Sequence, residues 1–211
     1  MKEKKVKRFL AITMFLTCIL IFSGSFIANS TVSIRPIEIS NAFINDTNSV
    51  KNDLSISDTI NMKDSLRRKL IENVDNHIRK NFKIYDKNLP VYLVDHSLKY
   101  DIDLCFMMAQ TTIETGFGTA GAGKPSSRHS LFGVCKRYSN YNHAIEDYCK
   151  LLRRSYLGNK KTEHDLMKNY VTFGGARYAS NRRYESELSN EYKRIRNRTQ
   201  IYELWTELKN S

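Results

Sequence analysis

The sequence contains little proline and glycine, with 3 and 9 residues respectively among 211. Such scarcity excludes a collagen-like chain and a long low-complexity linker. Hydrophobic residues make up 41% of the chain and charged residues 27%, so the composition is that of a globular protein and not of a disordered one. This length is enough for one medium-sized domain with additional segments.

Sequence motifs for metal binding, nucleotide binding and catalysis by a serine nucleophile are absent as well. The four cysteines form no Cys-x-x-Cys pair, and the five histidines form no His-Glu-x-x-His motif. No Gly-x-Ser-x-Gly motif is present. Residues 116–121 match a dinucleotide-binding loop by letters, but they follow a predicted helix, whose C-terminus repels anions, instead of a strand. We therefore expect neither a metal ion nor a cofactor.

One long apolar run lies near the N-terminus. Five basic side chains occur within residues 2–8, and residues 9–22 form an uncharged, largely apolar run. Residues 28–30 fit the small-x-small pattern of a cleavage site, so residues 1–30 are predicted as a secretory signal peptide. An uncleaved N-terminal membrane anchor fits equally well, because the apolar segment counted through residue 28 has about the length that spans a bilayer. Either form predicts that the remaining chain is secreted or held outside the cytoplasm, in the periplasm or the cell envelope.

Basic residues outnumber acidic ones by 34 to 22, which gives a formal net charge of +12. Residues 31–211 keep 29 basic and 21 acidic side chains, a net charge of +8. Outside the cytoplasm nucleic acid is scarce and anionic wall polymers are close by, so the charge favours cell-wall binding. The alternative is a generally solvated basic surface. Basic residues in 182–198 alternate with glutamates on a helical pattern, which indicates a salt-bridged solvent face and no nucleic-acid partner.

The pattern of polar and apolar residues divides the rest of the chain into two parts. Residues 31–56 are rich in Asn, Ser, Thr and Asp without a clear period and are predicted as a polar tether. Helical spacing begins at Ser57 or Asp58, and apolar residues then recur every four positions from residue 66 to residue 82. Residues 57–211 are therefore predicted as one domain.

Helical patterns continue through that domain, and no convincing run of alternating strand residues occurs. Asp103 and Gly116 are suited to cap the two ends of one helix, and Pro90 is suited to the first turn of the helix before it. We predict a mainly α fold with at most a short hairpin. The predicted helices after the first cover residues 90–100, 104–115, 143–156, 162–170, 183–195 and 202–208.

Three cysteines lie in the part predicted to be exported. In an oxidising compartment two of them are expected to pair, and Cys135 with Cys149 is the favoured pair because both flank the turn at residues 138–142. The alternative is that Cys105, Cys135 and Cys149 are all small buried hydrophobes.

Glu114 is the strongest candidate for a catalytic residue. It lies in the last turn of the predicted helix 104–115, after a mostly apolar stretch that includes Met107 and Ile113. A carboxyl group at a helix C-terminus opposes the helix dipole, and burial there raises its pKa. A general acid for glycoside cleavage needs such a carboxyl, because it must hold a proton near neutral pH. On position alone, the alternative is an exposed glutamate at a helix end.

Four segments resemble, in order, the signatures of the family 73 glucosaminidases, which are peptidoglycan hydrolases with a lysozyme-like fold. Residues 109–118 match A-Q-x-x-x-E-[ST]-G-[WF]-G, and residues 130–134 resemble N-L-F-G-I. Residues 141–148 resemble the start of a family helix, and residues 177–185 resemble the closing Y-A-T-D-x-x-Y element. The resemblance covers about residues 89–195 and implies a lysozyme-like α+β fold that is mainly α, with a reduced or absent β-lobe.

The resemblance also implies roles for individual residues. Glu114 is expected to be the general acid that protonates the glycosidic oxygen, and Tyr178 a second catalytic residue that polarises the reacting sugar. For Phe117 and Phe132, plain core packing is the alternative to a role in glycan binding. The residues expected to bind the glycan are Phe117, Ser130, Phe132, Gly133, Tyr138 and Tyr141.

Two departures from the family pattern affect the mechanism. Ser130 replaces the usual Asn, and the β-lobe that often carries a second carboxylate is reduced to residues 135–140, which contain no Asp or Glu. Glu146 and Asp147 match helix residues of the family and are expected to orient or cap. With one acid, two routes stay open: attack by the substrate's own N-acetyl group, or attack by the muramic acid 6-hydroxyl as in lytic transglycosylases.

The predicted function is cleavage of β-1,4 bonds in the glycan strands of peptidoglycan, preferably as an N-acetylglucosaminidase. The alternatives are a lytic transglycosylase or muramidase on the same glycan, and an inactive module that binds the wall or assists assembly. A short, anchored hydrolase would suit making a local gap for envelope-spanning machinery, such as a secretion or conjugation apparatus. Growth, division and phage release would be served equally.

Overall fold

The chain is largely helical over the residues that the computed structural model describes, which are 49–83, 86–121, 128–133, 136–158 and 161–211. These residues form no strand, and the β pairing among them is one isolated antiparallel bridge between Val171 and Arg177. The predicted mainly α fold is therefore confirmed.

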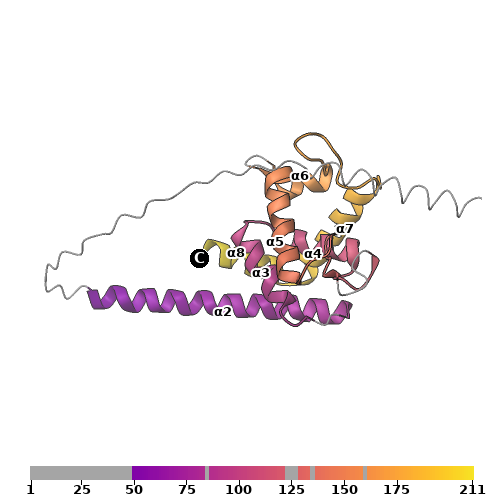
Figure 1. The fold of residues 1–211 in the computed structure, drawn as a ribbon. Helices are drawn as coiled ribbons and strands as arrows, with labels where there is room; N and C mark the ends of the chain where they lie inside the picture. Colours follow the sequence, from indigo (N-terminus) through magenta and orange to yellow (C-terminus); the bar gives the residue numbers. More distant parts are fainter. Residues whose placement is uncertain (1–48, 84–85, 122–127, 134–135, 159–160) are drawn as a thin grey trace, which may run out of the picture. The chain divides into compact units, whose positions relative to one another are not determined.

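Eight helical segments follow one another along the described residues (Figure 1). They are α2 (Ser49–Asn81), α3 (Leu89–Lys99), α4 (Leu104–Thr115), α5 (Tyr141–Leu152), a π-helix η3 (Arg153–Leu157), α6 (Glu163–Lys168), α7 (Tyr184–Arg198) and α8 (Ile201–Asn210). From α3 onward the predicted helices are confirmed, and their ends lie within three residues of the expected positions when η3 is counted as the continuation of α5.

Helix α4 is buried around most of its surface, and α3, α7 and α8 pack against it. Every side chain of residues 104–111 is buried. At its start, the side chain of Asp103 accepts hydrogen bonds from the backbone N–H groups of Cys105 and Phe106 at 2.8 and 3.2 Å. At its end, Gly116 takes the left-handed conformation with a φ of +51°. Both predicted caps are confirmed, so the length of α4 is set by its own sequence.

Helix α2 begins at Ser49, earlier than predicted. The apolar stripe that packs against α3 and α8 is as expected, with fully buried residues every four positions from Leu70 to Ile78. Residues 49–56, which the sequence assigns to the polar tether, are helical, so the predicted start of the helix at Ser57 or Asp58 is wrong by about eight residues. Polar residues extend this helix because adding a residue to an existing helix is far less costly than nucleating a new one.

The first 48 residues lie outside the described part of the structure. They include the predicted signal peptide or membrane anchor, residues 1–30, which stays a prediction. Among the helices that the structure describes, none has both the length and the apolar character needed to span a membrane.

Cys105 and Cys149 are free thiols in the core, with no exposed surface. The favoured Cys135–Cys149 disulfide is therefore wrong, because Cys149 faces apolar neighbours on the inner side of α5. Cys135 lies outside the described residues. Burial raises the pKa of Cys149 to about 12 and also raises that of Cys105, so both stay protonated and pack as small hydrophobes.

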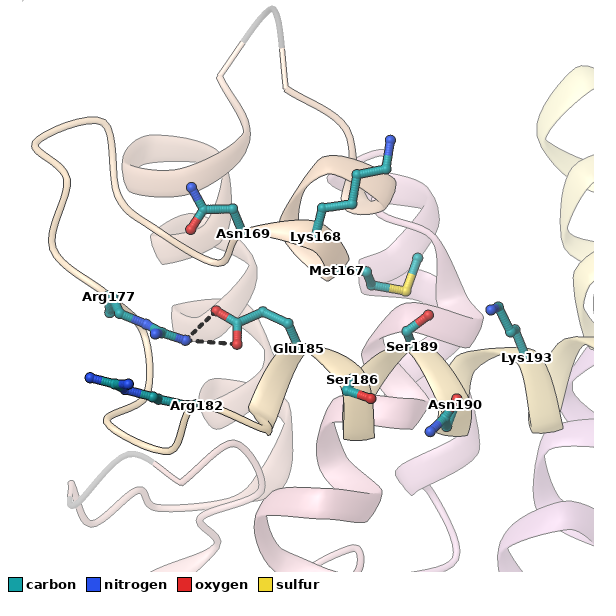
Figure 2. A pocket seen from close by; sticks show the side chains of 10 residues that line it. All are labelled: Met167, Lys168, Asn169, Arg177, Arg182, Glu185, Ser186, Ser189, Asn190 and Lys193. Atoms are coloured by element: carbon teal, nitrogen blue, oxygen red, sulfur yellow. Dashed lines mark hydrogen bonds and ion pairs between the residues drawn. The ribbon is translucent and has the colours of Figure 1, made fainter.

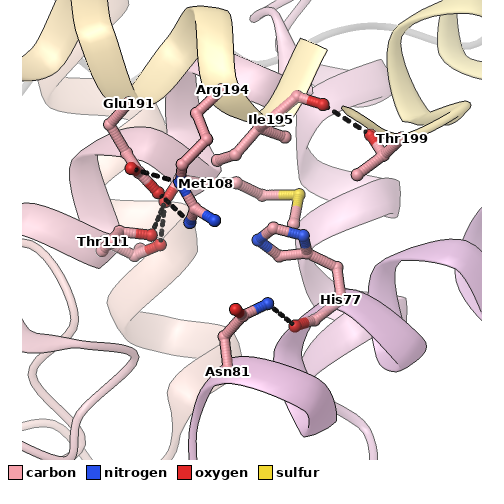
Figure 3. A network of polar contacts seen from close by, with 9 residues as sticks. His77, Asn81, Met108, Thr111, Glu191, Arg194, Ile195 and Thr199 are labelled. Carbon is pink, nitrogen blue, oxygen red and sulfur yellow. Dashed lines mark hydrogen bonds and ion pairs between the residues drawn. The ribbon is translucent and has the colours of Figure 1, made fainter. Parts of the chain in front are cut away.

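A buried histidine on α2 faces α4 and α7. The imidazole of His77 projects toward Met108 and Arg194 (Figure 3), and its Nε2 atom is buried without a hydrogen-bond partner. Arg194 itself pairs with Glu191 at 2.5 Å. Burial lowers the pKa of His77, and the guanidinium of Arg194 lowers it further. The folded protein therefore favours the neutral imidazole.

Acid is expected to destabilise the fold through His77. The unfolded chain takes up a proton at the ordinary histidine pKa of about 6.5, whereas the folded protein does so only at lower pH. Below about pH 6.5 the unfolded state binds more protons, so the free energy of unfolding falls as the pH falls, by up to about 1.4 kcal/mol per unit. Urea unfolding between pH 7.5 and 5 should show a steeper dependence in the wild type than in His77→Gln. The same substitution at exposed His164 is the control, and equal slopes for His77→Gln and wild type would contradict this assignment.

Candidate active site

Glu114 lies in the last turn of α4 and contacts the first residue of α7. Its Oε1 atom accepts a hydrogen bond from the hydroxyl of Tyr184 at 2.5 Å. The two residues are 70 positions apart in the sequence, and the packing of α4 against α7 brings them together. The first and the last of the four sequence segments therefore meet at one carboxyl group.

The backbone at Gly133 lies against the same carboxyl group. A Cβ atom at this position would overlap Oε2 of Glu114, and Gly133 has a left-handed φ of +69°. Atomic overlap excludes a side chain here, and a positive φ strains every residue except glycine. The glycine is what allows the chain to approach the carboxyl group so closely.

The surroundings of Glu114 raise the pKa of its carboxyl group. Burial is the largest cause, because removal from water disfavours the charged form. The hydroxyls of Tyr184 and Tyr178 act in the opposite direction, because hydrogen bonds to the carboxylate favour it. The burial effect is the stronger of the two, so Glu114 keeps its proton to a higher pH than an ordinary glutamate.

A cluster of tyrosines positions the two hydroxyls beside this carboxyl group. The rings of Tyr170 and Tyr178 stack with centroids 4.4 Å apart, and the rings of Tyr178 and Tyr184 lie 5.3 Å apart. The hydroxyl of Tyr178 donates to the carbonyl oxygen of Phe132 at 2.8 Å. Because Phe132 immediately precedes Gly133, this hydrogen bond ties the tyrosine cluster to the backbone at the site.

Gln110, one turn before Glu114 on α4, anchors the buried side of the cluster. Its Oε1 atom accepts hydrogen bonds from the hydroxyls of Tyr170, at 3.0 Å, and Tyr148. The ring of Tyr148 in turn stacks on Phe132 with centroids 3.5 Å apart. Gln110 is fully buried, so side chains, and not bulk water, satisfy these hydroxyls.

Thr115 joins the loop after α4 to the other two sequence segments. Its hydroxyl donates to the carbonyl oxygen of Leu131 at 2.7 Å and accepts from the N–H group of Gly118 at 3.0 Å. Gly118 has a φ of +83°, and a Cβ atom there would lie 2.8 Å from the hydroxyl of Tyr141. The second and third segments therefore meet the first at the C-terminal end of α4.

All four segments thus converge around Glu114, and all four lie within a match to a known family. A model of the glucosaminidase family, described as mannosyl-glycoprotein endo-β-N-acetylglucosaminidase, matches residues 92–197. The chain belongs to the glucosaminidase family. It is a glycoside hydrolase that acts on peptidoglycan. No curated protein and no solved structure matches the chain significantly.

Three of the predicted glycan-binding side chains lie inside this glucosaminidase. Phe117 and Phe132 are 1% and 2% exposed, and Ser130 is 1% exposed. Phe117 packs against Phe82 with ring centroids 4.9 Å apart. For the two phenylalanines the structure favours the alternative of core packing. Both rings pack in the core and have almost no exposed surface for a sugar.

Three other predicted site residues, Tyr138, Tyr141 and Tyr178, keep part of their surface exposed. Tyr178 reaches the carboxyl group of Glu114. Tyr141 lies beside Gly118, in the loop that follows Glu114. Tyr138 contacts the ammonium group of a neighbouring lysine, and no contact within the described residues links it to Glu114. Burial raises the pKa of Tyr138 to about 12. A role in sugar binding stays a prediction for all three.

The acidic residues of α5 have partners of their own. Glu146 pairs with Lys99 at 3.1 Å, and Asp147 pairs with Lys136 at 2.5 Å. Both contacts fit the expected orienting role. Within the described residues no other carboxylate shifts the pKa of Glu114, and no group of three His, Cys, Asp or Glu side chains is placed to hold a metal ion.

Two residues that hold the site together were not among the predicted site residues. Tyr184 is the last tyrosine of the closing element, and that motif position was the available signal for it. Gln110 is part of the first signature, but its presence in that motif does not show that its side chain accepts hydrogen bonds from two tyrosine hydroxyls. Both roles depend on how α4 packs against distant parts of the chain.

Gly133→Ala is expected to displace the carboxyl group of Glu114 and to lower activity by about 100-fold, since a misplacement of about 1 Å has that effect. Gly175→Ala is the matched control, because Gly175 also has a positive φ, +83°, yet a Cβ atom there meets nothing within 4 Å. Each variant should lose about 1–2 kcal/mol of stability from backbone strain. Thermal denaturation and a peptidoglycan-clearing assay measure the two effects. Equal activity of the two variants would contradict the contact.

Proposed function

We propose that Glu114 is the general acid of a β-1,4-N-acetylglucosaminidase that cleaves the glycan strands of peptidoglycan. The observation that carries this proposal is a carboxyl group that is largely removed from water, has a raised pKa and accepts a hydrogen bond from Tyr184 at 2.5 Å. A general acid must hold its proton near neutral pH and then release it. Burial supports the first property. The hydroxyl of Tyr184 supports the second, because it stabilises the carboxylate that forms.

One acid and the acetamido group of the substrate are enough for the reaction. Glu114 donates its proton to the glycosidic oxygen while the bond from that oxygen to the anomeric carbon breaks. The acetamido oxygen of the same N-acetylglucosamine attacks the anomeric carbon and forms a cyclic oxazolinium. Water then opens this ring and returns a proton to the carboxylate of Glu114, which leaves a reducing N-acetylglucosamine end.

Tyr178 is the second residue that we place in the catalytic machinery. Its hydroxyl donates to the carbonyl oxygen of Phe132 and reaches the carboxyl group of Glu114. A phenol in this position can contact the sugar at the anomeric carbon while the acid protonates the leaving oxygen. Part of the surface of Tyr178 is exposed, which supports that role.

The same acid would also serve other reactions on the same glycan. In lytic transglycosylation the muramic acid 6-hydroxyl is the nucleophile, and in a muramidase the bond on the other side of muramic acid is cut. The four glucosaminidase segments favour hydrolysis at N-acetylglucosamine over both. The contact between Glu114 and Tyr184 favours catalysis over an inactive module for wall binding or assembly.

The site of action that we propose is outside the cytoplasm, where peptidoglycan lies. Export or anchoring by residues 1–30 would place the domain there, and the net charge of +8 on residues 31–211 would favour retention among anionic wall polymers. A local opening for envelope-spanning machinery is one use that fits a short, anchored hydrolase.

Digestion of purified sacculi tests the proposal. The wild type is expected to release fragments with reducing N-acetylglucosamine ends, identified by mass spectrometry after reduction. Glu114→Gln should slow the release by ~100-fold or more, because general acid catalysis contributes ~10²–10⁴-fold. Glu163→Gln is the matched control, because burial raises the pKa of Glu163 as well, but this carboxyl binds the N–H group of Asp103 at the opposite end of α4.

Each other outcome of this digestion has a definite meaning. Anhydro-muramic ends would identify lytic transglycosylation, and reducing muramic acid ends would identify a muramidase. Binding to sacculi without cleavage by the wild type would support the inactive module. Full activity of Glu114→Gln would remove this residue from the mechanism.

Tyr184→Phe is expected to move the alkaline limb of the kcat profile to higher pH. The lost hydrogen bond favoured the carboxylate, so its removal raises the pKa of Glu114 further and keeps the acid protonated at higher pH. At the pH optimum kcat should fall by about 10–100-fold, because hydrogen bonds to charged groups contribute about 1.5–3 kcal/mol. The pH dependence of kcat on soluble glycan strands measures both effects.

Tyr192→Phe is the matched control for this substitution. Tyr192 also lies on α7 and also donates to a carboxylate, that of Asp103, at 2.9 Å. Its loss should lower stability without moving the alkaline limb. If the alkaline limb of the kcat profile of Tyr184→Phe stays at the wild-type pH or moves to lower pH, the role given to Tyr184 is contradicted.

A further inference from the structure

An open pocket of about 540 Å³ lies beside the tyrosine cluster, between α6, α7 and the loop that joins them (Figure 2). This volume is within the usual range for small-ligand sites, ~300–1,000 Å³. One side of the pocket is formed by polar residues of α7, which include Ser186, Ser189 and Asn190. None of the predicted site residues lines it.

The pocket carries a strong positive charge. Four basic side chains and one carboxylate line it, which leaves a net charge of +3. Arg177 is bound to the carboxylate, that of Glu185, by hydrogen bonds of 2.6 and 2.7 Å, which Figure 2 shows. Lys168, Arg182 and Lys193 are exposed and form no ion pair with the residues that the structure describes. Three cations are therefore available for an anionic ligand.

Residues that line the pocket are sequence neighbours of residues that contact Glu114. Arg177 is followed in sequence by Tyr178, and Glu185 is preceded by Tyr184, so each of these tyrosines has a pocket-lining neighbour. The ion pair between Arg177 and Glu185 also holds the α6–α7 loop against the start of α7. The backbone that holds Tyr178 and Tyr184 at Glu114 therefore also carries two of the residues that line the pocket.

We propose that this cationic pocket binds the carboxylates of the peptide stems of peptidoglycan, so that the enzyme recognises strands that still carry their stems. This inference rests on the proposed function, in which the glycan lies at Glu114. A stem of four or five residues extends ~13–18 Å at ~3.3–3.6 Å per residue, which is long enough to reach from a glycan strand to a neighbouring pocket. Its free carboxylates match the three available cations.

The remaining lining residues favour a peptide over a phosphodiester polymer such as a teichoic acid. Ser186, Ser189, Asn190 and Asn169 offer hydroxyl and amide groups that hydrogen-bond to peptide N–H and C=O groups. The backbone of a phosphodiester polymer has no peptide N–H and C=O groups to pair with them. Such a polymer is also bound best by a long basic stripe, whereas these cations line a single open pocket.

The test compares two soluble, uncrosslinked substrates: glycan strands with their peptide stems, and the same strands after an amidase has removed the stems. The pocket variant combines Lys168→Ala, Arg182→Ala and Lys193→Ala. It is expected to raise KM about tenfold on stem-bearing strands, with kcat unchanged, and to match the wild type on bare strands. The charge-matched control combines three exposed residues of α2 in Arg68→Ala, Lys69→Ala and Lys80→Ala and should leave both KM values unchanged.

Calorimetric binding of an N-acetylmuramoyl tetrapeptide provides a readout that does not depend on cleavage. The pocket variant should lose at least tenfold in affinity, and the α2 control should bind as the wild type does. If the wild type binds the tetrapeptide but cleaves neither strand, the proposed function fails while the pocket assignment stands. Circular dichroism checks that the variants fold, which is expected for exposed alanine substitutions.

Three outcomes would overturn the assignment. One is an equal rise of KM on stem-bearing and bare strands, which would make the pocket part of glycan binding or of the fold. Another is no change in KM or in tetrapeptide affinity. The third is loss of binding to poly(glycerol phosphate) with unchanged tetrapeptide binding, which would identify a phosphodiester polymer as the ligand.

Discussion

The hydrogen bond between Glu114 and Tyr184 is the interaction on which the site depends. It joins the end of α4 to the start of α7 at 2.5 Å, and the backbone of Gly133 lies against the second oxygen of the same carboxyl group. Three parts of the chain that are far apart in sequence therefore meet around one acidic group. Because this group is mostly withdrawn from water, the contacts around it decide how tightly it holds a proton.

The buried hydrogen bonds beneath the site explain how this position is kept. Gln110 accepts hydrogen bonds from two tyrosine hydroxyls, those of Tyr148 and Tyr170. The ring of Tyr170 stacks on that of Tyr178, which in turn packs against the ring of Tyr184. The residues next in sequence to Tyr178 and Tyr184, Arg177 and Glu185, form an ion pair that lines the cationic pocket. The proposed catalytic site and the proposed stem-binding pocket are therefore formed by neighbouring residues of the same two chain segments, 177–178 and 184–185.

The sequence predicted what is encoded locally. Helix α4 was predictable because Asp103, Gly116 and the apolar run between them all act within one helix, and Glu114 could be placed in its last turn. The donor to its carboxyl group could not be predicted, because which tyrosine of the closing element reaches it depends on how α7 packs against α4. The sequence also did not show which side chains are exposed. Phe117 lies in a glycine-rich loop, yet its ring is buried in the core. The Cys149 pairing failed for a similar reason, since a position near a turn does not reveal that the side chain faces inward.

Direct titration of the carboxyl group of Glu114 tests the central claim. Carbon-13 NMR of protein labelled at the glutamate side-chain carboxyls follows each group as the pH changes, and the resonance absent from Glu114→Gln identifies position 114. The resonance that is missing in that variant is expected to titrate above the usual value for glutamate, which is near 4.3, whereas that of Glu163, whose pKa burial also raises, stays in both spectra. A resonance for position 114 that titrates at or below the ordinary value would show that the side chain is a solvated carboxylate at neutral pH, and it would contradict the assignment of Glu114 as the acid.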